Sequence, residues 1–325
     1  MNFPAQIDGL ENLTLPPRPL HLAIGMFDGV HLGHRAVIDA AVHAAKSAGG
    51  LSGVLTFWPH PSALFRPEQP TRLIQPAATK ARMLCGLGVD AVITQPFTAE
   101  LAAIEAEDFL LWLTRALPHL AAVYVGENFR FGRGRRGDVA LLAAAGRRLG
   151  VRVFSAPRVN LDGEPISSTR IRALLEHGEI ELANTLLGYA YFAHGYVSPG
   201  KRLGRTIGFP TLNVPWSPGL PPRLGVYAVR IAASPATAEG WRPGVANYGL
   251  RPTVENATEP RLEVHVLGPC ALGEGDHVKV EWLRFLRPEK KFAGLEELRA
   301  QITLDRTAAA EFFAPPEHRA APSGL

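Results

Sequence analysis

The stretch HLAIGMFDGVHLGHRAVIDAAVHA, residues 21–44, decides the fold of the first half of the chain. Its first four residues, His21–Ile24, form a short apolar run that is typical of a β-strand. A turn containing three glycines follows, and after it apolar residues recur at helical spacing: Ala36, Val37, Ala40, Ala41 and Ala44. A strand that leads through a glycine-rich turn into a helix is the first unit of an α/β sheet.

Strand and helix patterns alternate through the rest of this half. The apolar runs predicted as further strands are Val54–Phe57, Val89–Gln95, Ala122–Val125 and Val151–Ala156. The segments predicted as helices are Ala78–Leu87, Glu107–Leu117 and Val139–Leu149. Such alternation requires right-handed crossover connections and a parallel sheet that is covered on both faces. The first half is therefore predicted to be an open, doubly wound α/β domain.

The pattern changes after Ile171–Leu187, a helical stretch that small residues interrupt. Short runs bounded by Gly and Pro follow and are predicted as strands: Tyr191–Val197, Gly225–Ile231, Gly244–Asn247, Arg261–Leu267 and Val278–Arg284. This spacing is typical of an antiparallel barrel, and a last helix is predicted from Leu295 to Phe313. We place the boundary at Leu187, which gives domains 1–187 and 188–325, and we expect the tail from Ala314 to be disordered.

Composition limits the classes of function. The 325 residues suffice for about two domains, and 34 Lys and Arg against 30 Asp and Glu leave a net charge of +4. So small a surplus favours phosphorylated small molecules in pockets over a long polynucleotide track. Cys85 and Cys270 can form neither a disulfide framework nor a four-cysteine zinc site. The start, Met1–Leu13, lacks the pattern of a signal peptide, and no run approaches about 20 apolar residues, so we expect a cytoplasmic protein without a membrane anchor.

The turn at residues 25–34, GMFDGVHLGH, has the features of an anion site. Glycines let backbone N–H groups approach a polyphosphate, and the start of the following helix adds a partial positive charge. His31 and His34 are three residues apart and share one helix face, where two imidazoles can donate hydrogen bonds to developing phosphate charge. The plainer interpretation is a glycine-rich turn with a capping histidine. A zinc site is disfavoured because no further Cys or His cluster joins the pair.

This turn resembles the HxGH signature of nucleotidyltransferases, and its form GxFDGxHxGH is similar to the adenylyltransferase module of bacterial bifunctional riboflavin kinase/FAD synthetases. Residues 126–132 (GENFRFG) and 166–172 (ISSTRIR) match two further patterns of that family in order, and residues 56–61 (TFWPHP) are similar to its TFxPHP turn. Taken alone, the basic run at 133–136 is either a solvated loop or a phosphate contact, and the Ser–Thr segment is either a helix cap or a triphosphate site.

The resemblance implies a Rossmann-like nucleotidyltransferase domain in which His31 and His34 are catalytic. It implies that ATP is bound by residues of the three motifs: Gly25, Phe27, Asp28, Gly33, Asn128, Ser168, Thr169 and Arg172. It also implies that Pro59 and His60 border the flavin.

The second half carries GKRLGRTIGFPTLN at residues 200–213. A glycine-rich arc with basic residues can wrap ATP phosphates. Thr211 and Asn213 point to the same side of an extended segment, and their oxygens are reasonable ligands for a Mg²⁺ ion that keeps most of its water. An ordinary barrel turn is the alternative.

This segment resembles the riboflavin kinase motif that ends in PTAN, with Leu212 in place of Ala. Three later stretches are similar to other kinase motifs of the family: residues 247–253 (NYGLRPT), 262–265 (LEVH) and 286–292 (LRPEKKF). The resemblance implies a general base at Glu263. It places the ATP phosphates at Gly200, Lys201, Gly204 and Thr206, the metal at Thr211 and Asn213, and the flavin at Asn247, Arg287 and Glu289. The turn at 268–275 lacks the aromatic residue that the family usually has there.

The expected function follows from the two sets of motifs. A C-terminal barrel would phosphorylate riboflavin to FMN with Mg²⁺ and ATP, and the N-terminal domain would join FMN to AMP, giving FAD and pyrophosphate. Riboflavin, ATP, FMN and FAD would be the partners of a monomer or weak homo-oligomer, with no nucleic acid and no membrane. Two alternatives stay open: an enzyme with one of the two sites decayed, and a nucleic-acid-binding or tRNA-related protein that uses Arg130–Arg136.

Overall fold

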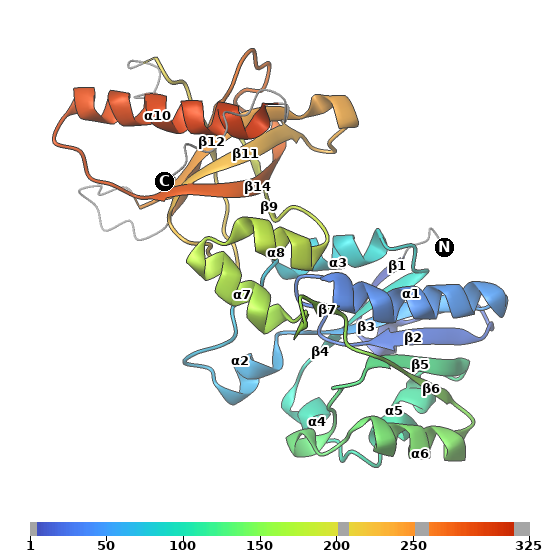
Figure 1. Cartoon of the computed structure of the whole chain (residues 1–325). Coiled ribbons are helices and arrows are strands. Elements are labelled where there is room, and N and C mark those ends of the chain that lie inside the picture. Colours follow the sequence, from blue (N-terminus) through green and yellow to red (C-terminus); the bar gives the residue numbers. More distant parts are fainter. Residues whose placement is uncertain (1–4, 201–207, 251–259, 315–325) are drawn as a thin grey trace. The chain divides into compact units, whose positions relative to one another are not determined.

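The computed structural model describes residues 5–200, 208–250 and 260–314, and the chain forms two compact units, Met1–Ser168 and Thr169–Leu325 (Figure 1). The predicted functional boundary at Leu187 stays a prediction. Four sequence predictions lie outside the described residues: those for Lys201, Gly204 and Thr206, and the disorder of the tail beyond Ala314. No helix within the described ranges is long and apolar enough to cross a membrane.

The first unit is built on a six-stranded sheet with the order β1-β4-β3-β2-β5-β6. Every neighbouring pair is parallel. The strands are β1 (Ala5–Asp8), β2 (Leu20–Ile24), β3 (Leu51–Trp58), β4 (Ala91–Pro96), β5 (Leu120–Gly126) and β6 (Arg152–Ala156). The predicted parallel α/β sheet is therefore confirmed, with β1 added at one edge.

The helices of this unit are α1 (Leu32–Ser47), α2 (Pro61–Phe65), α3 (Ala77–Cys85), α4 (Ala99–Ala102), α5 (Phe109–Ala116) and α6 (Val139–Leu149). Of these, α1 and α3 cover one face of the sheet, and α5 and α6 cover the other. One hydrophobic cluster joins alternate strand residues such as Ala23 to α1 and α3, and the other joins residues such as Leu22 to α5 and α6. Successive strand residues thus point to opposite faces, and both faces are buried, as a doubly wound sheet requires.

The strand order determines where a ligand site forms in this unit. From β2 the chain proceeds to β3 and β4 on one side, and then returns to place β5 and β6 on the other side of β2. In an open parallel sheet, ligands bind at the carboxyl ends of the two strands between which the order reverses. Those two strands are β2 and β5, and they are followed by the predicted loops at 25–34 and 126–132.

The second unit begins one residue into α7 (Ser168–His177), and Gly178 separates this helix from α8 (Ile180–Leu187). Its strands are antiparallel in the order β10-β13-β12-β11-β14-β9. They are β9 (Phe192–Tyr196), β10 (Leu212–Val214), β11 (Gly225–Ala233), β12 (Arg242–Gly249), β13 (Arg261–Val266) and β14 (His277–Pro288). A bridge between Ser198 and Asn213 joins the two ends of this order, so the sheet is a nearly closed barrel, as predicted.

Aromatic side chains fill the barrel. Trp282 is fully buried and contacts Tyr227 and Tyr248 edge to face, with ring centroids 4.6 and 5.5 Å apart. Outside the barrel, α10 (Leu295–Phe313) packs on β11 and β12 through an apolar cluster that includes Val226 and Ala309. The predicted C-terminal helix is confirmed.

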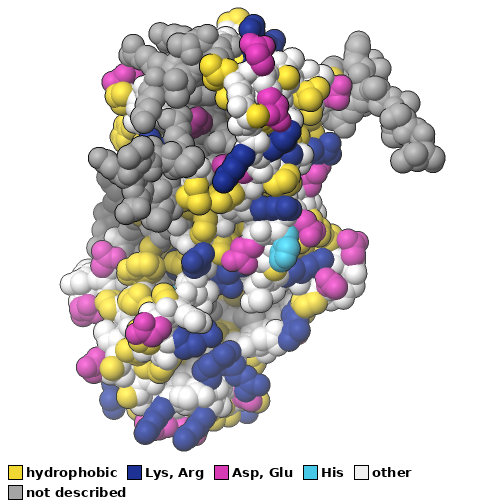
Figure 2. Space-filling view, turned by 90° about the vertical axis from the view of Figure 1, so that its left-hand side faces the viewer, with side chains coloured by type: hydrophobic (Ala, Val, Ile, Leu, Met, Phe, Trp, Pro, Cys, Tyr) yellow, Lys and Arg dark blue, Asp and Glu magenta, His cyan; other side chains and the backbone are white. Residues whose placement is uncertain are grey.

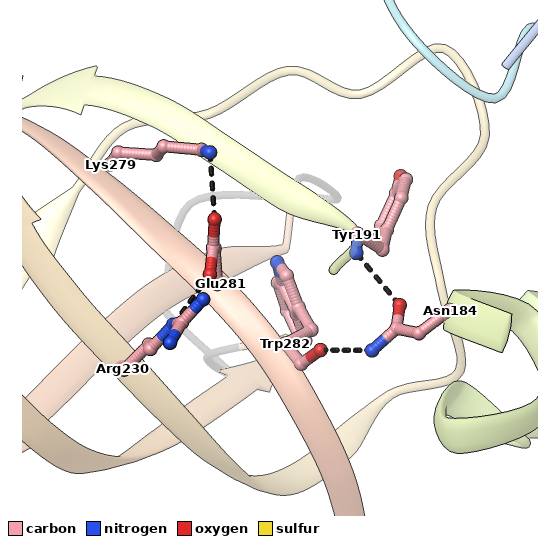
Figure 3. A network of polar contacts seen from close by, with 6 residues as sticks. All are labelled: Asn184, Tyr191, Arg230, Lys279, Glu281 and Trp282. Carbon is pink, nitrogen blue, oxygen red and sulfur yellow. Dashed lines mark hydrogen bonds and ion pairs between the residues drawn. The ribbon is translucent and has the colours of Figure 1, made fainter. Parts of the chain in front are cut away.

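A polar network ties α8 to the barrel (Figure 3). The Asn184 amide nitrogen donates to the Trp282 carbonyl at 2.8 Å, and its amide oxygen accepts the Tyr191 N–H at 2.7 Å. In the same view the buried Glu281 carboxylate accepts from Arg230 at 2.6 Å and from Lys279 at 2.7 Å. Asn184 thereby satisfies two backbone groups where β9 and β14 meet.

Candidate active sites

The loop after β2 has an unusual backbone. Gly25 still bonds to the sheet through its N–H, but Phe27, Gly29 and Val30 then take positive φ angles of 48°, 78° and 42°. Residues with a Cβ, above all β-branched ones, rarely adopt such angles. Asp28 anchors the turn on both sides: its carboxylate accepts the Ile74 N–H at 3.0 Å, and its carbonyl accepts the Ser168 hydroxyl at 2.9 Å.

The two predicted histidines lie together where this loop enters α1. The His31 and His34 rings are stacked with centroids 3.5 Å apart, and the His31 Nδ1 accepts the His34 N–H at 3.3 Å as the helix cap. The Phe27 ring contacts the His34 ring edge to face, with the two ring centroids 5.3 Å apart. A Cβ on Gly33 would stand 3.2 Å from the His31 ring, so the residue between the histidines has to be small. The start of the helix is electropositive and the paired imidazoles can donate hydrogen bonds, a combination that suits a phosphate.

The third motif touches the first through Ser168, whose hydroxyl bonds to the loop at Asp28. This contact joins segments 140 residues apart in the sequence. Thr169 and Arg172 follow in the first turns of α7 and belong to the second unit.

The second predicted loop, at 126–132, follows β5 at the same edge of the sheet. The Asn128 side-chain oxygen accepts a hydrogen bond from Arg158, which also pairs with Glu127 at 2.9 Å. Asn128 itself is exposed, whereas Phe131 inserts into the core against Phe109, with ring centroids 4.9 Å apart. The core-facing aromatic residue thus anchors the loop and leaves Asn128 at the surface.

The arginines of this loop and of the residues after it are exposed, and several have acidic partners. Arg133 and Arg136 pair with Glu105 at 3.0 and 3.8 Å, and Arg130 pairs with Asp138 at 3.6 Å. Figure 2 shows dark blue Lys and Arg side chains gathered in the lower part of its view, at the height where Figure 1 draws α4 and α6. Exposed pairs of this kind contribute little stability, but they neutralise part of the local charge.

Pro59 and His60 lie after β3, which is the other neighbour of β2. The His60 Nδ1 caps α2 by accepting the Ser62 N–H at 3.1 Å, and Pro59 is exposed. Since parallel strands end at one edge, this turn lies at the same edge of the sheet as the loops after β2 and β5.

Sequence reasoning missed Lys80, which is buried beneath the first loop beside Thr56, the first residue of the TFWPHP turn. Lys80 is only 2% exposed, and its Nζ donates to the Met26 carbonyl at 3.0 Å and to the Thr56 hydroxyl at 2.9 Å. Thr56 in turn donates to the same carbonyl at 3.0 Å. Burial lowers the pKa of Lys80 to about 8, although the negative charge of Asp28 opposes this shift. The available signal was the position of Lys80 four residues before Leu84, on the buried face of α3.

The second unit contains a cavity of about 330 Å³ that barrel strands and α10 line. It brings together five predicted site residues from four separate motifs: Thr211, Asn247, Glu263, Arg287 and Glu289. Residues that sequence reasoning did not single out also line it, among them Phe209 and Asp305.

The strand register explains this convergence. Asn213 lies opposite Glu263, Glu263 opposite Asn247, Asn247 opposite Val226, and Val226 opposite Arg287. Residues directly opposite one another in a sheet project from the same face, so these five form one row across five strands. Gly200 adjoins the end of the row, since a Cβ there would stand 2.0 Å from the Asn213 amide nitrogen.

Arg287 makes a close ion pair with α10. Its guanidinium donates two hydrogen bonds of 2.7 Å to the carboxylate oxygens of Asp305, which is 6% exposed and also accepts from Gln301 at 3.0 Å. His265 likewise fixes the segment before β10, because its Nδ1 lies 2.8 Å from the Pro210 carbonyl oxygen.

Comparison with known proteins finds a family match in each half of the chain. The FAD synthetase family model matches residues 15–170, and the riboflavin kinase model matches residues 187–313. Curated bifunctional riboflavin kinase/FMN adenylyltransferases are similar over nearly their whole length. The protein of Escherichia coli K12 is 39% identical over 94% of this chain and 97% of its own. That of Pseudomonas fluorescens is 37% identical over 96% and 99%, and that of Bacillus subtilis 34% over 90% and 92%.

A solved structure shares the fold. A Streptococcus pneumoniae chain titled a macrolide-efflux protein superposes with a TM-score of 0.83 and 26% identity, covering 94% of this chain and 98% of that one. Curated relatives are 37–39% identical to this chain over almost its whole length, so the chain belongs to the bifunctional riboflavin kinase/FMN adenylyltransferase family.

Proposed function

We infer that this chain catalyses both reactions of its family, the phosphorylation of riboflavin to FMN and the adenylylation of FMN to FAD. The observation that carries the inference is the presence of two separate built sites. One is the paired histidines at the sheet edge of the first unit, and the other is the row that ends at Arg287 in the second. The FAD synthetase model ends at residue 170 and the riboflavin kinase model begins at residue 187, which supports the functional boundary at Leu187.

The kinase step uses the cavity between the barrel and α10. Glu263 accepts the proton of the ribityl 5′-hydroxyl as that oxygen attacks the γ-phosphorus of ATP, and the bond to the β-phosphate oxygen breaks to release ADP. Asn247, Arg287 and Glu289, which line the cavity, hold the flavin. The family motif supports Gly200, Lys201, Gly204 and Thr206 as contacts of the phosphates.

The oxygen donors of Thr211 and Asn213 suit Mg²⁺, which prefers such hard ligands and keeps several waters. Asn213 lies directly opposite Glu263 in the sheet, so the site places a carboxylate beside the predicted ligands. The ion, when bound, neutralises phosphate charge during transfer.

Adenylylation uses the loop after β2. An FMN phosphate oxygen attacks the α-phosphorus of a second ATP in line, and pyrophosphate leaves from the opposite side. His31 and His34 donate hydrogen bonds to the phosphate, where the start of α1 adds positive charge. The family motifs support Asn128, Ser168, Thr169 and Arg172 as ATP contacts, with Gly25, Phe27, Asp28 and Gly33 shaping the loop. They also support Pro59 and His60 as residues that border the flavin.

The acidic partners of Arg130, Arg133 and Arg136 favour small-molecule substrates over a nucleic acid. We further propose a cytoplasmic enzyme that acts as a monomer or weak homo-oligomer.

Chromatography of flavins after incubation with Mg²⁺ and ATP tests the assignment. Riboflavin should yield FMN and FAD with wild type, and FMN alone with His31→Ala. Glu263→Gln should leave riboflavin unchanged and still convert added FMN to FAD. The exposed residues His43 and Glu274 provide matched controls, His43→Ala and Glu274→Gln. Wild type that stops at FMN would indicate a decayed first site, and one that forms FAD only from added FMN would indicate a decayed second site. Wild type that forms no flavin product, yet retains RNA on a filter at moderate salt, would favour the nucleic-acid-binding alternative.

A further inference from the structure

A buried lysine lies beneath the catalytic loop of the first unit, outside all of the motifs. Lys80 is 2% exposed, and its ammonium group bonds to the Met26 carbonyl and the Thr56 hydroxyl. A buried charge is unfavourable unless its hydrogen bonds are well made. The retention of a lysine here, where a methionine of similar length would fill the same space, therefore requires a reason.

The first reason is the orientation of one carbonyl. A loop that binds a polyphosphate has to present its N–H groups to the anion. The carbonyl oxygens of the same loop carry partial negative charge, so they have to point away from the anion. Thr56 and Lys80 both donate to the Met26 oxygen, from distances of 3.0 Å each. They hold this negative end of the peptide dipole toward the protein interior.

The second reason is backbone strain. Phe27 and Val30 sit at φ angles of 48° and 42°, immediately after the carbonyl that Lys80 holds. Such angles persist only where surrounding contacts over-determine them. Those contacts are the Ile74 N–H and the Ser168 hydroxyl on Asp28, together with the two donors on Met26. The strained turn leads directly into His31.

We propose that Lys80 is a positioning residue for adenylyl transfer, which together with Thr56 fixes the Met26 carbonyl and thereby the loop that presents His31 and His34 to ATP. This inference rests on the proposed adenylyltransferase function of the first unit. Lys80 contacts backbone and Thr56, not the reacting atoms, so its effect is on geometry and on the local field.

The test uses the full-length chain supplied with FMN and ATP, so that FAD formation is measured independently of the kinase. Lys80→Met removes the ammonium group and keeps the length of the side chain; Lys46→Met, at an exposed lysine near the end of α1, is the matched control. A misplacement of about 1 Å at a reacting centre costs about 100-fold in rate. We therefore expect kcat for FAD formation to fall about 100-fold in Lys80→Met while KM for ATP changes far less. Conversion of riboflavin to FMN in the same chain should be unchanged.

Two further variants separate positioning from a general loss of structure. Lys80→Gln keeps a hydrogen-bond donor and should recover part of kcat. Thr56→Val removes both the bond to the Met26 carbonyl and the acceptor for Lys80, and should lose about 30-fold, the effect of two hydrogen bonds. A Lys80→Met chain that forms FAD at the wild-type kcat would overturn the proposal. If that variant does not fold, wild-type kcat in both Lys80→Gln and Thr56→Val would overturn it instead. A wild type that makes FMN but no FAD refutes the function of the first unit itself, a result that is distinct from a Lys80 effect.

Discussion

Replacing Asp305 by Ala should loosen α10 from the barrel and impair the kinase selectively. The Asp305 carboxylate is buried, accepts both 2.7 Å bonds from Arg287, and is 18 residues away from it in the chain. The substitution leaves the Arg287 guanidinium without this partner beside the cavity that α10 helps to line.

The magnitude follows from the burial of the two side chains. Removing one partner of a buried ion pair costs about 3–5 kcal/mol, because the other charge stays desolvated. Side-chain exposures of 20% for Arg287 and 6% for Asp305 leave the arginine some access to water, which places the loss at the lower end, about 3 kcal/mol. Because Asp305 also lines the cavity, KM for riboflavin should rise, whereas FAD formation from added FMN should not change.

Urea denaturation followed by circular dichroism and tryptophan fluorescence measures the stability change, and flavin chromatography measures the two activities. Glu297→Ala is the control, because Glu297 also makes an ion pair from α10, with Lys290 at 2.9 Å, but both side chains are about half exposed. Such an exposed pair is worth about 0–1 kcal/mol. Equal losses of unfolding free energy in the two variants, or a normal KM for riboflavin in Asp305→Ala, would refute the reasoning.

Three other substitutions or conditions address the remaining features. Because burial lowers the pKa of Lys80 to about 8 from its ordinary 10.5, kcat for FAD formation should fall as pH rises through 8. Between pH 8 and 10.5 the unfolded chain still binds this proton and the folded chain has released it. The Lys80 contribution to the unfolding free energy therefore rises with pH across this range, by about 3 kcal/mol. Denaturation of wild type and of Lys80→Gln at several pH values in this range measures the change. Gly29→Ala places a Cβ 2.8 Å from Ile74 at a φ of 78°, and should slow FAD formation without affecting FMN formation in the same assay. Asn184→Ala removes both backbone bonds that it makes between β9 and β14, and should lower the unfolding free energy of the second unit by about 2 kcal/mol in urea.

Much of the fold and of the candidate sites was predictable because the deciding signals are local. Short apolar runs located the main strands and period-3.6 patterns located the main helices, and the last helix spans Leu295–Phe313 as predicted. The glycine turn that joins β2 to α1 is also local, since its glycines and paired histidines lie within ten residues. The family motifs added residue roles, which the proposed experiments test.

Other features depend on which segments become neighbours, and these the sequence did not specify. The short strand Ala5–Asp8 has alternating polar residues and becomes a strand only by pairing with β4. The row from Asn213 to Arg287 depends on strand register, where a shift of one residue would turn each side chain to the opposite face.

Two charged residues illustrate the same limit. Lys80 and Asp305 each lie on a helix, where a charged side chain is ordinarily solvated. Lys80 bonds to a carbonyl 54 residues earlier in the chain, and Asp305 to a guanidinium on another element. The sequence by itself determined the motifs and most of the elements, because local apolar patterns and turn chemistry encode them. Only the tertiary structure decided which charges are buried, because burial is set by partners that are distant in the chain.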